Sequence, residues 1–420
     1  MPNTSIELLK DQIYKWENIG QICDLMIIGG VEMGSSDIHI EPLTNIVRLR
    51  YRIDGELREV LEYQTFLHQQ VVARFKIMSN LKIDESRIPQ DGRLSTVINN
   101  KALDLRVSTL PTVHWEKIVM RIVDKSKKIP DLFELGIEGH NKMLLEKAIN
   151  MPNGIILTSG PTGSGKSTTL YSCLTKLNAP DVNIMTLEDP VESQIDGLNQ
   201  SQMFPDIGYN FAYGLRTALR QDPDIIMVWE IRDHETINVA IEADLTGHLV
   251  VSTIHTNSAA ETLTRILNMG IQAFLLPATI NAIIAQRLIR KICQHCKKPV
   301  SMNELDPRMK ANVEKALKRT SKEELLSRIS ADVLQKPMFY EPVGCAECEN
   351  IGYKGRVGIY EILEITPAIK KLIIDGASAT IINDIAITDG MISLEQDGII
   401  KALNGRTSLA EVYSAAKENA

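Results

Sequence analysis

The segment GPTGSGKST, residues 160–168, decides the fold class of this chain. It matches the pattern G-x-x-x-x-G-K-[ST] in full. It follows the apolar run GIILTS and opens a helical segment, STTLYSCLTKLN. Because a strand, a glycine-rich loop and a helix occur in that order, the segment predicts a phosphate-binding loop, and a glycine-rich turn that matches by chance is the alternative.

A phosphate-binding loop uses its glycines to let backbone N–H groups surround the phosphates, and the following helix N-terminus adds favourable charge. Lys166 is expected to reach the outer phosphates, and the Ser167 hydroxyl to bind Mg²⁺. The chain has no Asn-Lys-x-Asp motif for reading guanine, which favours ATP. The predicted nucleotide-binding residues are Gly160, Pro161, Thr162, Gly163, Ser164, Gly165, Lys166, Ser167 and Thr168.

Short apolar runs alternate with helical segments from about residue 137 onward. The runs are GIILTS, NIMTLE, DIIMV and HLVVSTI. This alternation predicts an α/β domain with a parallel sheet and helices on both of its faces. Ligands of such sheets bind at the carboxyl ends of the strands, so polar residues there are the candidates for chemistry.

Acidic residues and histidines lie beside these runs. TLEDPVE carries Glu188, Asp189 and Glu192, and DIIMVWE ends in Glu230, which we interpret as the acid near Mg²⁺. TGHLVVSTIHTN carries His248 before a predicted strand and His255 at its end, where a histidine can sense the γ-phosphate. Taken singly, an acid at a strand end is more often a helix cap or a surface charge, and a lone histidine is usually a satisfied polar group.

Residues 1–125 predict a smaller α+β domain, and residues 126–137 a linker. In NIVRLRYRI, the apolar residues 47, 49, 51 and 53 alternate with arginines, which is typical of a half-buried strand. Asp54-Gly55 predicts a hairpin turn, and Asn99-Asn100 a second turn. FLHQQVVARFKIMSNL has helical spacing.

The cysteines predict a metal site. Two CxxC pairs can meet in a closed, structural zinc site with four thiolate ligands, here within residues 291–350. A redox pair or unrelated thiols are the alternatives. The charged, helical stretch between the pairs is expected to be a solvated insertion. The pairs are Cys293 with Cys296 and Cys345 with Cys348, and Cys23 and Cys173 stand alone.

Length and charge limit the function classes. A chain of 420 residues suggests two or three domains. The net charge of −7 argues against a protein that tracks along DNA, which would need a basic surface. The most apolar stretch, AFLLPATINAIIAQRLI, is interrupted by Pro277, Asn281 and Gln286, and the first residues lack a signal-peptide pattern. We therefore expect a cytosolic protein with at most peripheral membrane contact.

Taken together, these motifs resemble those of the secretion and type IV pilus assembly ATPases of the type II/IV secretion superfamily. The resemblance covers roughly residues 30 to 420. It rests on SSDIHIEP, RYRIDGEL, RIPQDGRL, DLRVSTLPT, GPTGSGKSTTLY, TLEDPVE, LRQDPDIIMV, EIRD, TGHLVVSTIHTN, the two CxxC pairs and GYKGRVGIYEIL.

The resemblance implies a hexameric ring whose subunits have a PAS-like N-terminal domain and a RecA-like motor domain, here residues 138–420. It implies that Glu192 is the general base, that Glu230 is the Walker B acid, and that His248 and His255 form a histidine box. It also implies that several arginines contact phosphates or lie near the ring interface, the alternative for the first three being ordinary salt-bridged sheet residues. These are Arg93, Arg106 and Arg121 in the N-terminal domain, and Arg216 and Arg220 in the motor domain.

The resemblance further implies partners and a location. The CxxC pairs are similar to those of ATPases that assemble filaments, whereas retraction ATPases lack them. A ring at the cytoplasmic membrane would drive an integral membrane platform protein, which in turn moves pilin or pseudopilin. The additional N-terminal domain that often precedes the PAS-like domain is expected to be missing.

Two tryptophans depart from the pattern of the family. Trp229 and Trp115 stand where the family usually has glycine. If the backbone at 229 has positive φ, a tryptophan there is strained, and hydrolysis would be impaired. This leaves three hypotheses: an ATP-hydrolysing motor, a nucleotide-binding ring subunit that hydrolyses little, and a nucleic-acid motor.

Overall fold

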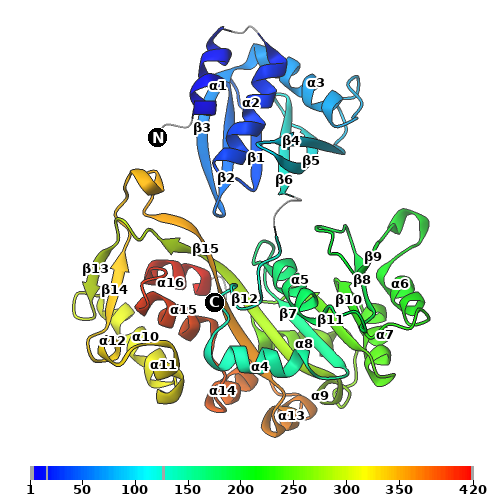
Figure 1. The fold of residues 1–420 in the computed structure, drawn as a ribbon, viewed down its shortest axis with the longest axis vertical. Coiled ribbons are helices and arrows are strands. Elements are labelled where there is room, and N and C mark those ends of the chain that lie inside the picture. The colour runs from blue at the N-terminus through cyan, green and yellow to red at the C-terminus, as the bar shows by residue number, and fades with distance from the viewer. Residues whose placement is uncertain (1–3, 16–17, 125–127, 418–420) are drawn as a thin grey trace. The chain divides into compact units, whose positions relative to one another are not determined.

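The computed structural model describes residues 4–15, 18–124 and 128–417, which fall into two compact units that divide after Lys128 (Figure 1). The first two residues of the predicted linker, 126 and 127, lie outside the described residues. From Ile129 onward the chain belongs to the second unit, where Leu132 and Ile137 are buried in the core. This part of the predicted linker is therefore packed rather than free.

The first unit is an antiparallel sheet with three helices packed against it, so the predicted α+β class is confirmed. The strand order is β3-β2-β1-β6-β5-β4. The helices are α1 (Thr4–Lys15), α2 (Ile19–Glu32) and α3 (His68–Met78). The strands are β1 (Asp37–Pro42), β2 (Ile46–Ile53), β3 (Glu56–Gln64), β4 (Gln90–Ile98), β5 (Lys101–Pro111) and β6 (Glu116–Asp124).

The alternation predicted for β2 is confirmed. Val47, Leu49 and Tyr51 are fully buried, and they pack with apolar side chains of all three helices. Both predicted hairpin turns are also present. Asp54 and Gly55 have φ of 51° and 92°, and Asn99 and Asn100 have φ of 51° and 61°, as a two-residue type I′ turn requires.

The second unit is built on a seven-stranded sheet in the order β15-β12-β7-β11-β10-β8-β9, in which only β15 is antiparallel to its neighbour. The strands of this sheet are β7 (Gly154–Ser159), β8 (Ile184–Glu188), β9 (Asn199–Gln202), β10 (Ile225–Trp229), β11 (Leu249–Ile254), β12 (Ile280–Ile292) and β15 (Tyr353–Glu364).

Helices cover both faces of this sheet, as predicted (Figure 1). Ile155 and Leu157 of β7 face a core shared with α7 and α8, whereas Ile156 between them faces a core shared with α4 and α5. The helices are α4 (Gly139–Ile149), α5 (Lys166–Leu177), α6 (Phe211–Ala218), α7 (His234–Leu245), α8 (Ala259–Asn268), α9 (Leu276–Thr279), α13 (Pro367–Ile374), α14 (Ala379–Thr388), α15 (Leu394–Leu403) and α16 (Leu409–Lys417).

The most apolar stretch of the sequence, residues 273–289, forms a short helix and a strand. It forms α9 and most of β12, and β12 lies between β7 and β15 in the sheet. None of the helices in the described residues has the length and apolar character needed to cross a bilayer.

The stretch between the two CxxC pairs is not the solvated insertion that we expected. It contains the small sheet of β13 (Lys298–Ser301) and β14 (Met338–Glu341), with α10 (Pro307–Lys318), α11 (Lys322–Arg328) and α12 (Ala331–Gln335). Val313, Ile329 and Phe339 are buried in one core with α15 and α16. The guanidinium of Arg328, at 1 % exposure, bonds to Asp397 of α15 at 2.5 Å. The insertion is thus fixed to the rest of the second unit by apolar packing and a buried ion pair.

Candidate nucleotide site and cysteine cluster

The predicted phosphate loop connects β7 to α5. Gly165 has φ of 91°, a left-handed conformation that glycine adopts without strain, and α5 begins at the next residue. The Lys166 ammonium donates to the carbonyls of Gly160 and Pro161 at 2.7 and 3.1 Å. Burial lowers the pKa of Lys166 to about 8, although Glu230 opposes the shift. The loop thus places a single buried amine where phosphate would bind.

Glu230 and His255 meet beside this loop. They directly follow β10 and β11, which are parallel neighbours, so both side chains emerge at the carboxyl edge of the sheet. One carboxylate oxygen of Glu230 lies 2.5 Å from His255 Nε2, and the other accepts from Arg232 Nε at 2.5 Å. Glu230 is 6 % exposed, so its charge is held by two partners in a poorly hydrated place.

Glu188 is buried and fully bonded. It accepts hydrogen bonds from the Tyr171 hydroxyl, from Thr186 Oγ1 at 2.5 Å and from Gln200 Nε2 at 3.0 Å. Burial and the neighbouring carboxylate raise the pKa of Tyr171. Glu188 is thus held in place by three side chains.

Tyr171 also holds the backbone that follows Glu188. Its hydroxyl oxygen accepts the N–H of Glu192 at 3.2 Å, which fixes the segment bearing Glu192 to α5 of the phosphate loop. Glu192 is half-buried, and Asp189 is exposed. The structure therefore distinguishes the three acids of TLEDPVE, two of which have carboxylates accessible to solvent.

Two residues of β12 also contact segments beside the site, Gln286 the phosphate loop and Arg287 the segment after β11, and sequence reasoning did not assign them to the site. Gln286 accepts from Thr169 Oγ1 and donates to the Ser164 carbonyl, both at 2.8 Å. Arg287, 3 % exposed, donates to the Asn257 carbonyl at 2.9 Å. The signal in the sequence was the pair of polar residues that interrupts an apolar run.

The arginines predicted in the first unit form one row. Arg93, Arg106 and Arg121 are direct cross-strand partners on β4, β5 and β6, and Arg121 lies opposite Asp37 of β1. Directly opposed residues share a face of a sheet, so the three side chains leave the same face in one row. Arg121 bonds to Asp37 at 2.9 Å.

The arginines predicted near the ring interface lie on α6 and just after it. Arg216 pairs with Glu235 of α7 at 2.8 Å, and Arg220 donates to the Arg216 carbonyl at 2.8 Å. Both are placed by contacts within the second unit.

His248 does not join His255. It precedes β11, where its carbonyl accepts from Gly154 N at the start of β7, and its Nδ1 lies 2.9 Å from the Ala243 carbonyl. The six residues of β11 between the two histidines rise about 20 Å. Within this chain His248 therefore lies at the edge of the sheet opposite the phosphate loop.

The positive φ considered for residue 229 is not present. Neither Trp229 nor Trp115 is among the non-glycine residues with positive φ. Trp229 packs against the core shared with α4 and α5. Trp115 is 44 % exposed, and its carbonyl accepts from Thr112 Oγ1 at 2.5 Å.

The four cysteines of the CxxC pairs converge. All four Sγ atoms lie within 4.8 Å of one another, with Cys293 to Cys345 and Cys296 to Cys348 both at 3.8 Å. A tetrahedron of sulfurs around zinc at 2.3 Å has edges of about 3.8 Å, so the cluster has the right size. The N–H groups of Gly344 and Gly352 point at Sγ atoms at 3.2 and 3.1 Å, as suits thiolates.

Comparison with known proteins supports the same family as the motifs. The family model described as type II/IV secretion system protein matches residues 15–414. The chain is 47% identical over 395 residues to the type IV pilus assembly ATPase PilB of Pseudomonas aeruginosa, covering 94% of this chain and 66% of that protein. It is 43% identical over 399 residues to the type II secretion system ATPase E of Vibrio cholerae, covering 95% of this chain and 75% of that one. It thus spans about two thirds of the length of the pilus assembly relative.

Solved structures share the fold. The pilus retraction motor PilT with bound ADP superposes with a TM-score of 0.59 at 26% identity, covering 93% of this chain and 95% of that chain. The ATPase DotB of Legionella pneumophila superposes with a TM-score of 0.65 at 20% identity, covering 94% and 95%. The α/β prediction with a RecA-like motor unit is confirmed, and the chain belongs to the type II/IV secretion system protein family, a family of P-loop ATPases.

Proposed function

We propose that this chain is the ATP-hydrolysing motor subunit that powers assembly of a type IV pilus or a type II secretion pseudopilus. The observation that carries the proposal is the contact of Glu230 with His255 at the carboxyl edge of the sheet, beside Lys166. A metal-side acid, a residue that can sense phosphate and a phosphate-binding amine meet there, which are the parts that phosphoryl transfer needs.

The residues divide the work of hydrolysis as follows. The N–H groups of residues 163–168 and the Lys166 ammonium bind the phosphates of ATP. Ser167 and Glu230 would hold Mg²⁺, which neutralises charge on the phosphates. Glu192 takes a proton from water as the water oxygen bonds to the γ-phosphorus and the bond to the ADP oxygen breaks. His255 contacts Glu230, so loss of the γ-phosphate beside His255 would change the position of this pair.

Other parts of the chain supply structure and further contacts. Cys293, Cys296, Cys345 and Cys348 would hold a structural Zn²⁺, for which their spacing and N–H partners are suitable. The row of Arg93, Arg106 and Arg121 offers adjacent guanidinium groups for a phosphate.

The assembly and its location belong to the same proposal. We propose a homohexamer in the cytoplasm, bound peripherally to the cytoplasmic membrane through an integral membrane platform protein, with pilin or pseudopilin as the moved component. The printed names of the relatives, pilus assembly ATPase and secretion system ATPase, support this role. The net charge of −7 favours it over a nucleic-acid motor.

The test is steady-state ATP hydrolysis by the purified, zinc-loaded chain with Mg²⁺, with and without DNA. We expect turnover that DNA leaves unchanged, and a loss of about 10²- to 10⁴-fold in Glu192→Gln because the general base is removed. Trp229→Gly should stay within about threefold of the natural chain, since Trp229 has no positive φ to relieve. A silent natural chain that Trp229→Gly activates would instead support the weakly hydrolysing ring subunit.

A second test addresses the cellular role. In cells that lack this chain, its expression should restore surface pili or protein secretion, and Glu192→Gln should restore neither. Size-exclusion chromatography with light scattering should show the mass of six subunits in the presence of nucleotide. A monomer that restores neither process would contradict the motor proposal.

A further inference from the structure

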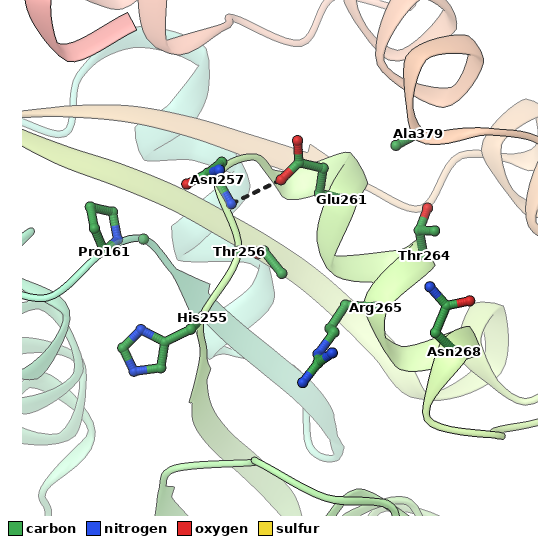
Figure 2. Close-up of a pocket in the computed structure, with 10 residues that line it drawn as sticks. Pro161, His255, Thr256, Asn257, Glu261, Thr264, Arg265, Asn268 and Ala379 are labelled. Carbon is green, nitrogen blue, oxygen red and sulfur yellow. Dashed lines mark hydrogen bonds between the residues drawn. The ribbon is translucent and has the colours of Figure 1, made fainter. Parts of the chain in front are cut away.

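A pocket of about 420 Å³ opens directly beside the start of the phosphate loop. Gly160 and Pro161 line one side of it, and His255 to Asn257, after β11, line the next. The far wall is one face of α8, completed by Ala379 at the start of α14 (Figure 2). The pocket therefore connects the nucleotide site to α8, and the hydrolysis proposed above uses His255 but none of the α8 residues that line it.

Arg265 of α8 is the cation of this pocket. Figure 2 shows its side chain extending from α8 on the side on which His255 lies. In the part of the chain that the structure describes, the guanidinium of Arg265 has no ion-pair or hydrogen-bond partner. This contrasts with Arg232 and Arg287 nearby, which bond to Glu230 and to Asn257. A guanidinium without a partner can bind an oxyanion through two parallel N–H groups.

Two neighbours on the same helix add hydrogen-bonding capacity. Thr264 Oγ1 is buried and has no hydrogen-bond partner among the described residues. Asn268 lines the pocket one turn further along α8, beside Arg265 (Figure 2). A hydroxyl, an amide and a guanidinium thus share one wall.

The one carboxylate in the pocket is already engaged. Glu261 accepts the N–H of Asn257 at 3.0 Å, drawn as the dashed line in Figure 2. On the other side of the same loop, Arg287 bonds to the Asn257 carbonyl. Arg287 also lowers the pKa of Lys166, although burial is the larger cause. Cationic Arg287 thus lies behind the loop side of the pocket, and Arg265 lies on the α8 side.

We propose that this pocket is a subsite for inorganic phosphate, in which Arg265 holds the phosphate after it has been cleaved from ATP and before it leaves the protein. The inference rests on the proposed hydrolysis for the source of the phosphate. Its physical basis is local: a phosphate that moves away from Lys166 past His255 meets Arg265, Thr264 and Asn268, which together provide charge and hydrogen-bond donors for a tetrahedral oxyanion.

The test is equilibrium dialysis of ³²P-labelled inorganic phosphate against the full chain saturated with ADP and Mg²⁺. Replacing Arg265 by Gln removes a charge-assisted, two-pronged contact and should weaken phosphate binding about tenfold or more. Arg265→Lys keeps the positive charge but loses the paired N–H groups of the guanidinium. Its phosphate affinity should lie between those of the natural chain and Arg265→Gln. Asn268→Ala should weaken binding about threefold, as loss of one neutral hydrogen bond does.

The matched control is Arg308→Gln, because Arg308 is an exposed arginine on α10, away from this pocket. It should leave phosphate binding unchanged. ADP affinity, measured in parallel, should change less than about twofold in all four variants, since the pocket begins where the phosphate loop begins. Arg265 is exposed, so Arg265→Gln should fold, and Asn268→Ala provides the same test if it does not.

Three results would overturn the proposal. In the first, Arg265→Gln and Asn268→Ala bind phosphate as the natural chain does. In the second, Arg265→Gln loses ADP to the same extent as phosphate, which makes Arg265 part of the nucleotide site. In the third, phosphate binding is unchanged but six-subunit assembly is lost, so that the pocket takes an acidic group of a second copy. If the chain hydrolyses no ATP but binds phosphate through Arg265, the hydrolysis proposal fails and the subsite stands.

Discussion

The nucleotide edge and the cysteine cluster are two sites in one unit that are built in opposite ways. The nucleotide edge takes single residues from separate elements, Lys166 from α5, Glu230 after β10 and His255 after β11, and the sheet alone brings them together. The cysteine cluster takes four identical ligands from two short segments. At the nucleotide edge, catalysis should depend on how the strands align. At the cysteine cluster, local folding should depend on a bound metal. Changes at the two sites should therefore affect different properties.

The largest expected effect is at the cysteine cluster. Cys345→Ser, or removal of zinc by a chelator, should abolish metal binding and unfold β13, β14 and the CxxC segments, because structural zinc sites contribute about 10 kcal/mol of apparent binding free energy to folding. Zinc content after gel filtration and thermal unfolding measure the two effects.

Cys23→Ala is the control for this comparison. Cys23 is a buried cysteine of the first unit, outside the cluster, so its replacement should leave the zinc content unchanged. Full zinc content and an unchanged melting curve in Cys345→Ser would mean that the four thiols are not a metal site.

The second effect is at the nucleotide edge and should have the opposite character. Lys166→Ala should lower ATP hydrolysis by about 10³-fold, roughly 4 kcal/mol, because no other buried amine faces the loop in the described residues. The fold should remain, since replacing a buried cation by alanine removes an unfavourable desolvation of charge. A variant that unfolds instead would show that Lys166 is structural, and phosphate release together with circular dichroism separates the two outcomes.

Local patterns predicted what depends on neighbours in sequence. The alternation at residues 47–53, the Asn99-Asn100 turn and the phosphate loop are each fixed by the geometry of a few consecutive residues, so they could be read directly. The family and the α/β class followed from several such patterns together.

The sequence was less informative where long-range pairing decides the structure. The stretch AFLLPATINAIIAQRLI, residues 273–289, is the most apolar in the sequence and was expected not to span a membrane, but only long-range pairing with β7 and β15 shows that it is a strand of the sheet from Ile280 onward. The insertion is rich in charged residues and so was expected to be solvated, but Val313, Ile329 and Phe339 are buried and Arg328 pairs with Asp397. His248 precedes β11 and His255 follows it, so the two could not share an edge. That conclusion was available from the strand alone, but the histidine box suggested by the family resemblance masked it.

The third prediction concerns the contact between the insertion and the rest of the second unit, and it tests whether a buried ion pair stabilises that contact. Arg328→Met should destabilise the second unit by about 3 kcal/mol, because it leaves Asp397 and Glu324 buried with fewer positive partners. Although burial raises it, Lys401 and Arg328 hold the pKa of Asp397 below its ordinary value. Chemical denaturation measures the change, with Arg308→Met as the exposed control, and equal stabilities would show that apolar packing alone fixes the insertion.

The smallest expected effect is the pH dependence of nucleotide binding. In the free protein the pKa of Lys166 is about 8, so the amine loses its charge as the pH rises through 8. An anionic nucleotide favours the protonated amine, and above this pKa its affinity should fall by up to about tenfold per pH unit. The phosphate groups of the nucleotide stay ionised between pH 7.5 and 9.5. A change of affinity with pH in this range therefore comes from a group of the protein. Lys166→Arg keeps its charge throughout this range and should give a flat profile in the same titration. A flat profile for the natural chain would mean that Lys166 stays protonated up to pH 9.5. The attraction of Glu230 for the ammonium would then outweigh the effect of burial on its pKa.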